Sequence, residues 1–371
     1  MIMEKEVFLR RLEKVYDRMK SLGTDCMLIT PGPDMKYLTG YSMGADERFL
    51  AAVFIPGQNP FIIANKLYKG PLGEIPYQEV LYWEDGQDPY ELLARELAKR
   101  EVPTGQMAVD DTAAAGLLVP VLHRFPGSGL RLSSEILGEL RMYKDSCEAR
   151  AMKTACEMAS EALRITMENG RRWIGHTEQE VAFALCHEMS KQGLAFGSAS
   201  VSSQESSAEP HHISSGKVIE DNTCMWIDFG SIYENYNTDM TRTFYFGEPD
   251  PEYLKIHRIV DQARRAGIQA AKAGNPLGMV DQAARSVIES YGYGQYFTHR
   301  TGHGIGIKNH EGPGAGPGET AVIAPGMAFT VEPGIYLPGR FGVRIEDQLL
   351  VDEDGNTQVL HSYPPDLKVF R

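Results

Sequence analysis

The apolar pattern of the first third of the chain predicts one amphipathic helix followed by short strands. Apolar residues recur at spacings of three and four and predict a helix that ends at Gly23; they are Phe8, Leu12, Val15, Met19 and Leu22. Short apolar runs between Pro and Gly turns predict strands at 26–30, 50–55, 61–64, 79–83 and 107–109. A further helix begins after Asp88, where Pro89 and Glu91 complete a capping box. This alternation predicts a small α/β domain, which carries no cluster of ligand-type residues.

The pattern then changes to that of longer helices, and this change places a domain boundary between about Ser133 and Asp145. We therefore expect an N-terminal domain of residues 1–135 and a second domain of residues 136–371. The second domain should contain two helices, a β-hairpin, two more helices and a second hairpin. The helices are expected at about 152–170, 177–193, 252–274 and 279–291, and the hairpins around Asp228 and Gly339.

The second domain repeats itself with a nearly constant offset. Gly274 follows Gly170 by 104 residues, and Glu332 follows Asp228 by 104 residues. Each of these two carboxylates is followed by a Gly and then by an Ile-Tyr pair. Internal duplication is the simplest explanation, and its two-fold axis would bring the two hairpins together.

The two hairpins carry two pairs of carboxylates. Asp228 and Asp239 flank a turn at 233–235, and a two-residue turn at either 233–234 or 234–235 puts them on one face, directly opposite or diagonal. Glu332 and Glu346 repeat the arrangement about Gly339. Carboxylates about 5–8 Å apart repel each other unless one is protonated or a cation lies between them. Four convergent carboxylates therefore indicate a cation site.

The composition of this site favours two divalent ions. Oxygen-rich sites suit hard or borderline divalent ions, and four carboxylates exceed what one catalytic ion needs while leaving a position open. Two ions about 3.5–4 Å apart, bridged by carboxylates, account for the set. His303 lies in a Gly-His-Gly-Ile-Gly run and offers a fifth ligand, because its flanking glycines let the backbone approach closely.

Charge and composition narrow the range of partners. The chain has 37 Lys and Arg against 50 Asp and Glu, and a net charge of −13 repels nucleic-acid phosphates and anionic lipid. The N-terminal stretch lacks the apolar core of a secretory signal and is expected to be mature, and the apolar run at 113–122 is shorter than the ~20 residues of a membrane helix. Five scattered cysteines form no CxxC pair. These features favour a cytoplasmic protein without a membrane or nucleic-acid partner.

The ordered motifs of the second domain resemble those of the pita-bread dinuclear metallopeptidases. The matching stretches are Asp228, Asp-Met-Thr-Arg-Thr at 239–243, Gly-His-Gly-Ile-Gly at 302–306, Glu-Pro-Gly at 332–334 and Arg-Ile-Glu-Asp at 344–347. The first domain, with Tyr-Leu-Thr-Gly at 37–40, resembles the creatinase-type domain of the Xaa-Pro dipeptidase (prolidase) and aminopeptidase P branch. The resemblance implies an α+β/α/β fold in which a creatinase-like α/β domain precedes a pseudo-two-fold pita-bread catalytic domain.

The resemblance also implies roles for single residues. The ligands of two divalent ions, with Mn²⁺ expected first and Co²⁺ or Zn²⁺ as alternatives, would be Asp228, Asp239, His303, Glu332 and Glu346.

Three further residues match active-site positions of the family. His211, after Pro210, matches a histidine near the substrate and leaving group, with the adjacent His212 as the alternative. His310 matches a second active-site histidine, and Arg344 matches an arginine of the substrate pocket. Relatives often have Ser-Gly and an Asn before the first histidine, whereas this chain has a Ser- and Glu-rich run at 202–209. No role is assigned to His123, His176, His187, His257, His299 and His361.

The resemblance implies a metal-dependent exopeptidase that hydrolyses the Xaa-Pro bond of dipeptides. A hydroxide bridging the two ions would attack, Glu332 would act as general base, and His211 and His310 would stabilise the oxyanion and guide the leaving nitrogen. The proline preference and a homodimer come from the resemblance alone. The alternatives are an aminopeptidase P acting on longer peptides, a creatinase-like hydrolase and an inactive binding protein; the five intact ligands argue against the last two.

Overall fold

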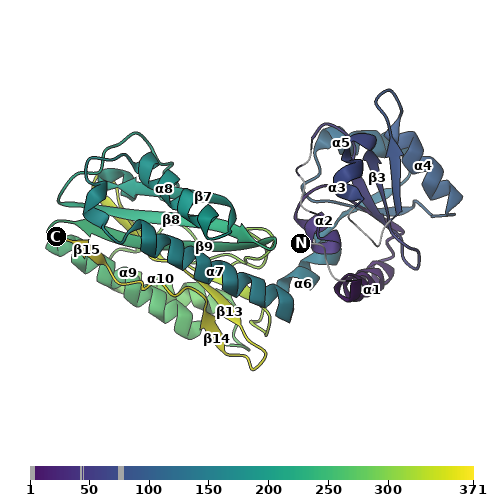
Figure 1. Ribbon diagram of the computed structural model, residues 1–371. Helices are drawn as coiled ribbons and strands as arrows, with labels where there is room; N and C mark the ends of the chain where they lie inside the picture. Colours follow the sequence, from purple (N-terminus) through teal and green to yellow (C-terminus); the bar gives the residue numbers. More distant parts are fainter. Residues whose placement is uncertain (1–4, 42–43, 45, 74–78) are drawn as a thin grey trace. The chain divides into compact units, whose positions relative to one another are not determined.

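The computed structural model describes residues 5–41, 44, 46–73 and 79–371, and it contains two compact units. The units are Met1–Arg141, the N-terminal unit, and Met142–Arg371, the C-terminal unit (Figure 1). Helix α6 (Ser134–Met142) runs through the expected boundary at 135/136 and ends at the junction. Among the helices in the described ranges, none combines the length and apolarity that a membrane crossing needs.

The N-terminal unit contains a six-stranded mixed sheet in the order β4-β3-β2-β1-β5-β6. Its strands are β1 (Cys26–Ile29), β2 (Ala51–Phe54), β3 (Phe61–Asn65), β4 (Glu79–Trp83), β5 (Gln106–Val109) and β6 (Gly129–Leu132). Its helices before α6 are α1 (Lys5–Ser21), α2 (Pro33–Thr39), η1 (Lys66–Tyr68), α3 (Lys69–Leu72), α4 (Pro89–Lys99) and α5 (Ala115–Arg124). All five predicted strands are present. The pattern missed β6, since this edge strand leaves Leu130 and Leu132 41% and 49% exposed and carries little apolar signal.

The start of α4 follows the predicted cap only in part. The Asp88 carboxylate accepts hydrogen bonds from the backbone N–H groups of Tyr90 and Glu91, as expected of an N-cap. The Glu91 carboxylate pairs with Arg124 at 2.7 Å instead of completing a capping box. A tertiary ion pair has therefore replaced the second half of the local motif.

The C-terminal unit places strands between two pairs of helices. The helical elements are α7 (Ser146–Thr166), η2 (Gly170–Trp173), α8 (Glu178–Lys191), η3 (Gln204–Ala208), α9 (Pro251–Ala270), α10 (Gly278–Ser290) and η4 (Gly294–Tyr296). One sheet, in the order β15-β9-β8-β7, is formed by β7 (Ala195–Ser203), β8 (Thr223–Tyr233), β9 (Tyr236–Phe246) and β15 (Lys368–Phe370). The other strands are β10 (Ala328–Val331), β11 (Gly334–Leu337), β12 (Phe341–Arg344), β13 (Asp347–Val351) and β14 (Thr357–Val359).

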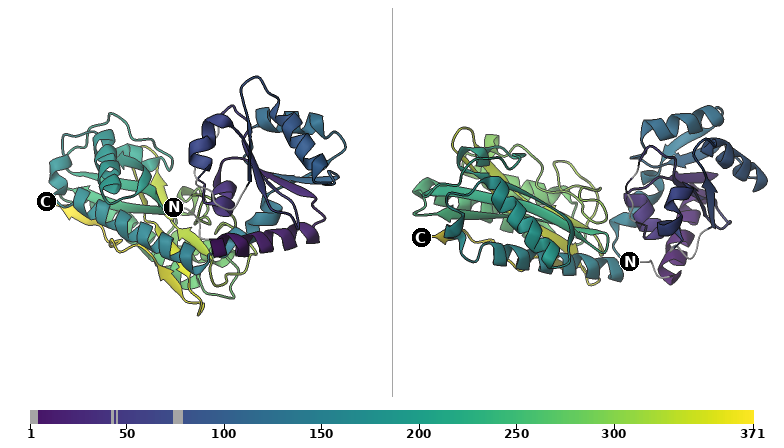
Figure 2. Two further views of the ribbon diagram at one scale, coloured as in Figure 1. Left: turned by 45° about the vertical axis from the view of Figure 1, so that its right-hand side comes forward. Right: turned by 45° about the horizontal axis from the view of Figure 1, so that its top comes forward.

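Each pair of helices buries one set of these strands. Apolar residues of α7 and α8 pack against the sheet face that holds Met225 and Ile227, whereas those of α9 and α10 pack against Ile335 and Val343. Figure 1 shows α8 on one side of β8 and β9 and α9 and α10 on the other side, and Figure 2 shows the ribbon from two further directions. This symmetric layering is what the internal repeat predicts.

The first hairpin joins β8 and β9 through the turn at 234–235. Tyr233 pairs with Tyr236, and Glu234 and Asn235 have φ values of 49° and 74°, as a tight two-residue turn requires. This is the second of the two predicted turns. Asp239 then pairs with Gly230, so Asp228 lies diagonal to Asp239.

The second hairpin consists of two strand pairs, β11 with β12 and β10 with β13, and the pairing register is the same in both. Gly334 pairs with Arg344 and Val331 pairs with Asp347, so Glu332 and Glu346 fall opposite each other in the same register. A three-residue loop centred on Gly339 closes the hairpin. The predicted arrangement of this carboxylate pair is confirmed.

Candidate metal centre

Because side chains alternate along a strand, the acidic residues of the first hairpin point away from helices α7 and α8. Ile227 and Phe229 of β8 and Met240 of β9 are buried in the core under α7 and α8. Because successive side chains of a strand point to opposite faces, Asp228 and Asp239 project from the other face. The apolar core thereby fixes where the carboxylates point.

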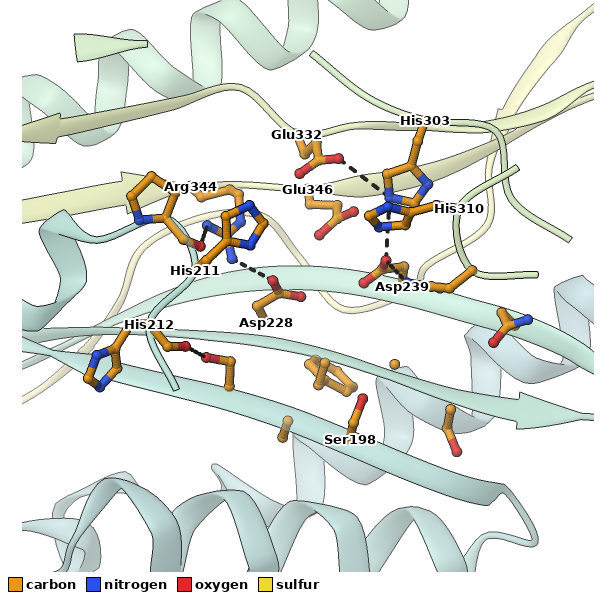
Figure 3. Close-up of a pocket in the computed structure, with 18 of the residues that line it drawn as sticks. Ser198, His211, His212, Asp228, Asp239, His303, His310, Glu332, Arg344 and Glu346 are labelled. Carbon is orange, nitrogen blue, oxygen red and sulfur yellow. Dashed lines mark hydrogen bonds and ion pairs between the residues drawn. The ribbon is translucent and has the colours of Figure 1, made fainter. Parts of the chain in front are cut away.

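All five predicted ligands come together, and His310 joins them. Among the described residues, the ligand atoms within each of three groups lie within 4.8 Å of one another, and Asp239, His303 and Glu346 each belong to two of these groups. Figure 3 shows these side chains converging from both hairpins and from the loop that carries His303. The groups are Asp239, His303 and His310; His303, Glu332 and Glu346; and Asp228, Asp239 and Glu346.

His303 presents one ring nitrogen to the carboxylates. Its Nδ1 donates to the Gly304 carbonyl at 3.1 Å, so that loss of the other ring proton would free Nε2 to act as a ligand. That Nε2 lies 3.6 Å from Asp239 Oδ2 and 3.5 Å from Glu332 Oε1. A Cβ at Gly302 would come within 1.9 Å of the Thr330 carbonyl, so glycine is required for this approach.

The pKa shifts of the clustered carboxylates indicate a site that positive charge would stabilise. Burial, with the charges of neighbouring carboxylates adding to it, raises the pKa of Glu332 to about 7 and the pKa of Glu346 well above its usual range. Burial alone would also raise the pKa of Asp239, but the hydrogen bond and charge of His303 lower it. Buried carboxylates this close together are difficult to ionise unless cations lie between them. Together with the imidazole nitrogen, their oxygens form a donor set that fits a pair of divalent cations.

Arg344 is buried beside the cluster and connects its two halves. Its guanidinium pairs with Asp228, donates from Nε to Thr241 Oγ1 at 3.1 Å and stacks 4.4 Å from the centre of the Trp226 ring. Thr241 Oγ1 in turn donates to Glu346 Oε2 at 2.8 Å. Trp226 and Cys224 lie on the same face of β8 as Asp228, and both are buried.

The two adjacent histidines point in different directions. His211 lies beside Arg344 and Asp228, whereas the His212 ring is directed away from the carboxylates (Figure 3). His212 Nε2 donates to Glu178 at 2.8 Å. His211 and His310 both line a cavity of about 760 Å³ that also exposes the acidic cluster. This volume suits a small ligand.

The structure adds residues that the sequence pattern did not select. His299, to which no role was assigned, lines the cavity and accepts a hydrogen bond from the Tyr336 hydroxyl at 2.9 Å. Asn309 donates to Asp239 Oδ2 at 3.0 Å. Both residues lie in irregular loops near His303, where no periodicity indicates the direction of a side chain.

Comparison with known proteins identifies the family. A model described as metallopeptidase family M24 matches residues 150–353, and one described as creatinase/prolidase N-terminal domain matches residues 11–143. The chain is 32% identical to a putative dipeptidase of Bacillus subtilis, over 98% of this chain and 100% of that protein. It is 31% identical to a Xaa-Pro dipeptidase of Lactobacillus delbrueckii, over 97% of this chain and 98% of that one.

A solved structure agrees with these matches. The crystal structure of a prolidase from Thermococcus sibiricus superposes with a TM-score of 0.92 at 33% identity and covers 98% of this chain and 99% of that chain. The fold is therefore that of a metal-dependent hydrolase with a creatinase-type N-terminal domain. The chain belongs to metallopeptidase family M24, and the predicted two-domain pita-bread fold is confirmed.

Proposed function

We propose that this chain is a Xaa-Pro dipeptidase that uses two divalent ions to remove the first residue of a dipeptide. The observation that carries the proposal is the convergence of four carboxylates and the His303 imidazole on one cavity. The names of the similar proteins support the substrate class, since one is a Xaa-Pro dipeptidase and another a prolidase.

The residues that would hold the ions are Asp228, Asp239, His303, Glu332 and Glu346. A bound pair of divalent ions supplies Lewis acidity for the scissile carbonyl and a water of lowered pKa. We propose Mn²⁺ as the natural metal, with Co²⁺ and Zn²⁺ as alternatives, because the donor set is rich in oxygen.

The surrounding side chains would perform the proton transfers and hold the substrate. Glu332 accepts a hydrogen bond from Thr330 Oγ1 at 3.1 Å and faces the cavity, so it is our candidate for the base that accepts a proton from water. His211 and His310 would donate to the developing oxyanion and guide the leaving imino nitrogen. Burial, and then the charge of His303, lowers the pKa of His310, which favours a neutral ring at pH 7.

Arg344 would act in two ways in this scheme. Its contact with Asp228 orients that carboxylate, and its place in the cavity wall makes it our candidate for substrate binding. The free amino group of the substrate would be attracted to the acidic end of the cavity, which favours exopeptidase chemistry.

Localisation and assembly complete the proposal. All five cysteines are free thiols, which is compatible with a reducing cytoplasm. A homodimer would be expected from the family resemblance, and sedimentation velocity at micromolar concentration would detect it directly.

The deciding experiment compares matched peptides with a defined metal. Chelator-treated protein, reloaded with Mn²⁺, should bind two ions per chain and hydrolyse Leu-Pro at least about 10-fold faster than Leu-Ala, by pocket discrimination. Leu-Pro-Gly should be cleaved more slowly than Leu-Pro. Preference for the tripeptide would instead indicate an aminopeptidase P, and a metal-loaded chain that cleaves none of these peptides would contradict the proposal.

A further inference from the structure

One fully buried carboxylate lies behind the wall of the cavity that carries His211. Glu178 is the first residue of α8, directly after the N-cap Thr177, and its side chain is 0% exposed. The N-terminus of a helix favours a negative charge, but a buried carboxylate is stable only when its oxygens receive hydrogen bonds. The donors to Glu178 therefore identify what this residue holds in place.

Five donors from one segment of the chain saturate the Glu178 carboxylate. Oε1 accepts from the backbone N–H and the hydroxyl of Ser203, at 2.8 and 2.9 Å. Oε2 accepts from the backbone N–H and the hydroxyl of Ser215, at 3.1 and 2.9 Å, and from His212 Nε2 at 2.8 Å. Burial alone would raise the pKa of Glu178, but these hydrogen bonds lower it, so the group is an ionised acceptor.

These contacts close a loop at its base. Ser203 is the last residue of β7, and Ser215 follows the stretch that passes along the cavity. Both ends of the segment 203–215 are thus held by the same side chain. Residues 203–209 of the Ser- and Glu-rich run lie inside that loop.

His211 is held between anchors that act on its two neighbours. The Pro210 carbonyl accepts a hydrogen bond from Arg344 Nη1 at 3.1 Å, and the His212 ring is held by Glu178. Within the part of the chain that the structure describes, no hydrogen bond holds the His211 ring itself. The position of His211 is therefore set by its neighbours, which direct it toward Asp228 while His212 points away (Figure 3).

We propose that Glu178 is a positioning residue that, through Ser203, His212 and Ser215, holds the His211 segment against the cavity. His212 then serves as an anchor of the segment and has no direct role at the reacting atoms. This inference rests on the proposed peptidase function for its kinetic consequence, whereas its structural consequence is independent of that function.

The kinetic test is a double-mutant cycle between Glu178 and His211. Glu178→Gln should lower kcat on Leu-Pro by between about 10- and 100-fold, as expected when a reacting group is displaced by about 1 Å, with unchanged Mn²⁺ content. In a His211→Asn background, Glu178→Gln should cause little further loss, because both substitutions remove the same contribution. Equal losses in both backgrounds, or loss of bound Mn²⁺, would overturn the proposal.

The structural test uses hydrogen exchange and a matched control. Glu180→Gln removes the same charge from the same turn of α8, but this carboxylate is 55% exposed and, among the residues that the structure describes, binds only its own helix cap and His176. Glu178→Gln should raise amide exchange in residues 203–216 with respect to Glu180→Gln, and this holds even if the chain cleaves no dipeptide. If Glu178→Gln does not fold, Ser215→Ala removes one donor and should raise exchange in the same residues; unchanged exchange there would refute the anchor.

Discussion

The four carboxylates of the metal centre differ in what holds each of them. Asp228 is paired with Arg344, Asp239 accepts from Asn309, and Glu346 accepts from Thr241. Glu332 receives a hydrogen bond from Thr330 and keeps 16% of its side chain exposed, whereas the whole Glu346 residue is only 2% exposed. Glu332 is thus the member of its pair that can reach both an ion and a water molecule in the cavity.

This difference makes Glu332→Gln the most informative single substitution. The amide keeps the size of the side chain but cannot accept a proton at neutral pH, so kcat on Leu-Pro should fall by at least about 100-fold, as is typical for loss of a general base. Steady-state kinetics and metal analysis of the same preparation would separate loss of the base from loss of an ion. Glu353→Gln, at an exposed site, is the control, and near-normal turnover by Glu332→Gln would remove our assignment of the base.

Between elements, α9 is joined to β9 by a buried histidine. His257 on α9 hydrogen-bonds through Nε2 to the Thr243 hydroxyl on β9 at 2.8 Å. Burial lowers the pKa of His257 to about 4, so the ring stays neutral in the folded chain at pH values where an unfolded chain protonates it. The packing of α9 on the strands therefore depends on pH.

The direction of this dependence follows from proton uptake. The unfolded chain binds a proton near pH 6.5 and the folded chain near pH 4, so His257 should reduce the unfolding free energy by up to about 3 kcal/mol as pH falls through this window. Denaturant unfolding between pH 7 and 4 should show a shallower decline for His257→Asn than for the original chain. Parallel pH profiles would contradict the assignment.

For the whole molecule, we expect bound divalent ions to stabilise the folded C-terminal unit. In the folded chain the two hairpins bring four carboxylates close together, which repel one another without cations. Ions that bind only the folded state therefore stabilise it by mass action. Free Mn²⁺ at about 100 times its dissociation constant should raise the unfolding free energy, relative to chelated protein, by about 2.7 kcal/mol for each ion bound.

Chemical denaturation with and without chelator would measure this coupling. The double variant Asp228→Asn, Asp239→Asn provides the control, because it has lost half of the carboxylates and should show a much smaller response to Mn²⁺. An equal response from the variant would mean that the ions bind elsewhere on the chain.

Periodic features of the chain were predictable because their rules are local. Alternation along β8 and β9 fixed Asp228 and Asp239 on one face, and the register about Gly339 placed Glu332 opposite Glu346. The helix caps, the internal repeat and the glycines around His303 are also encoded within short stretches. The sequence by itself therefore determined the fold and the set of carboxylates and the histidine that meet at the candidate metal centre.

Contacts between distant segments were decided only by the tertiary structure. The ring of His212 binds Glu178, 34 residues earlier in the chain, and the ring of His299 binds Tyr336, 37 residues later. Loop side chains have no periodicity that gives their direction, so their orientation depends on which partner the folded chain brings near. Burial beside other charges likewise raises the pKa of Glu332 to about 7, and this depends on the assembled site.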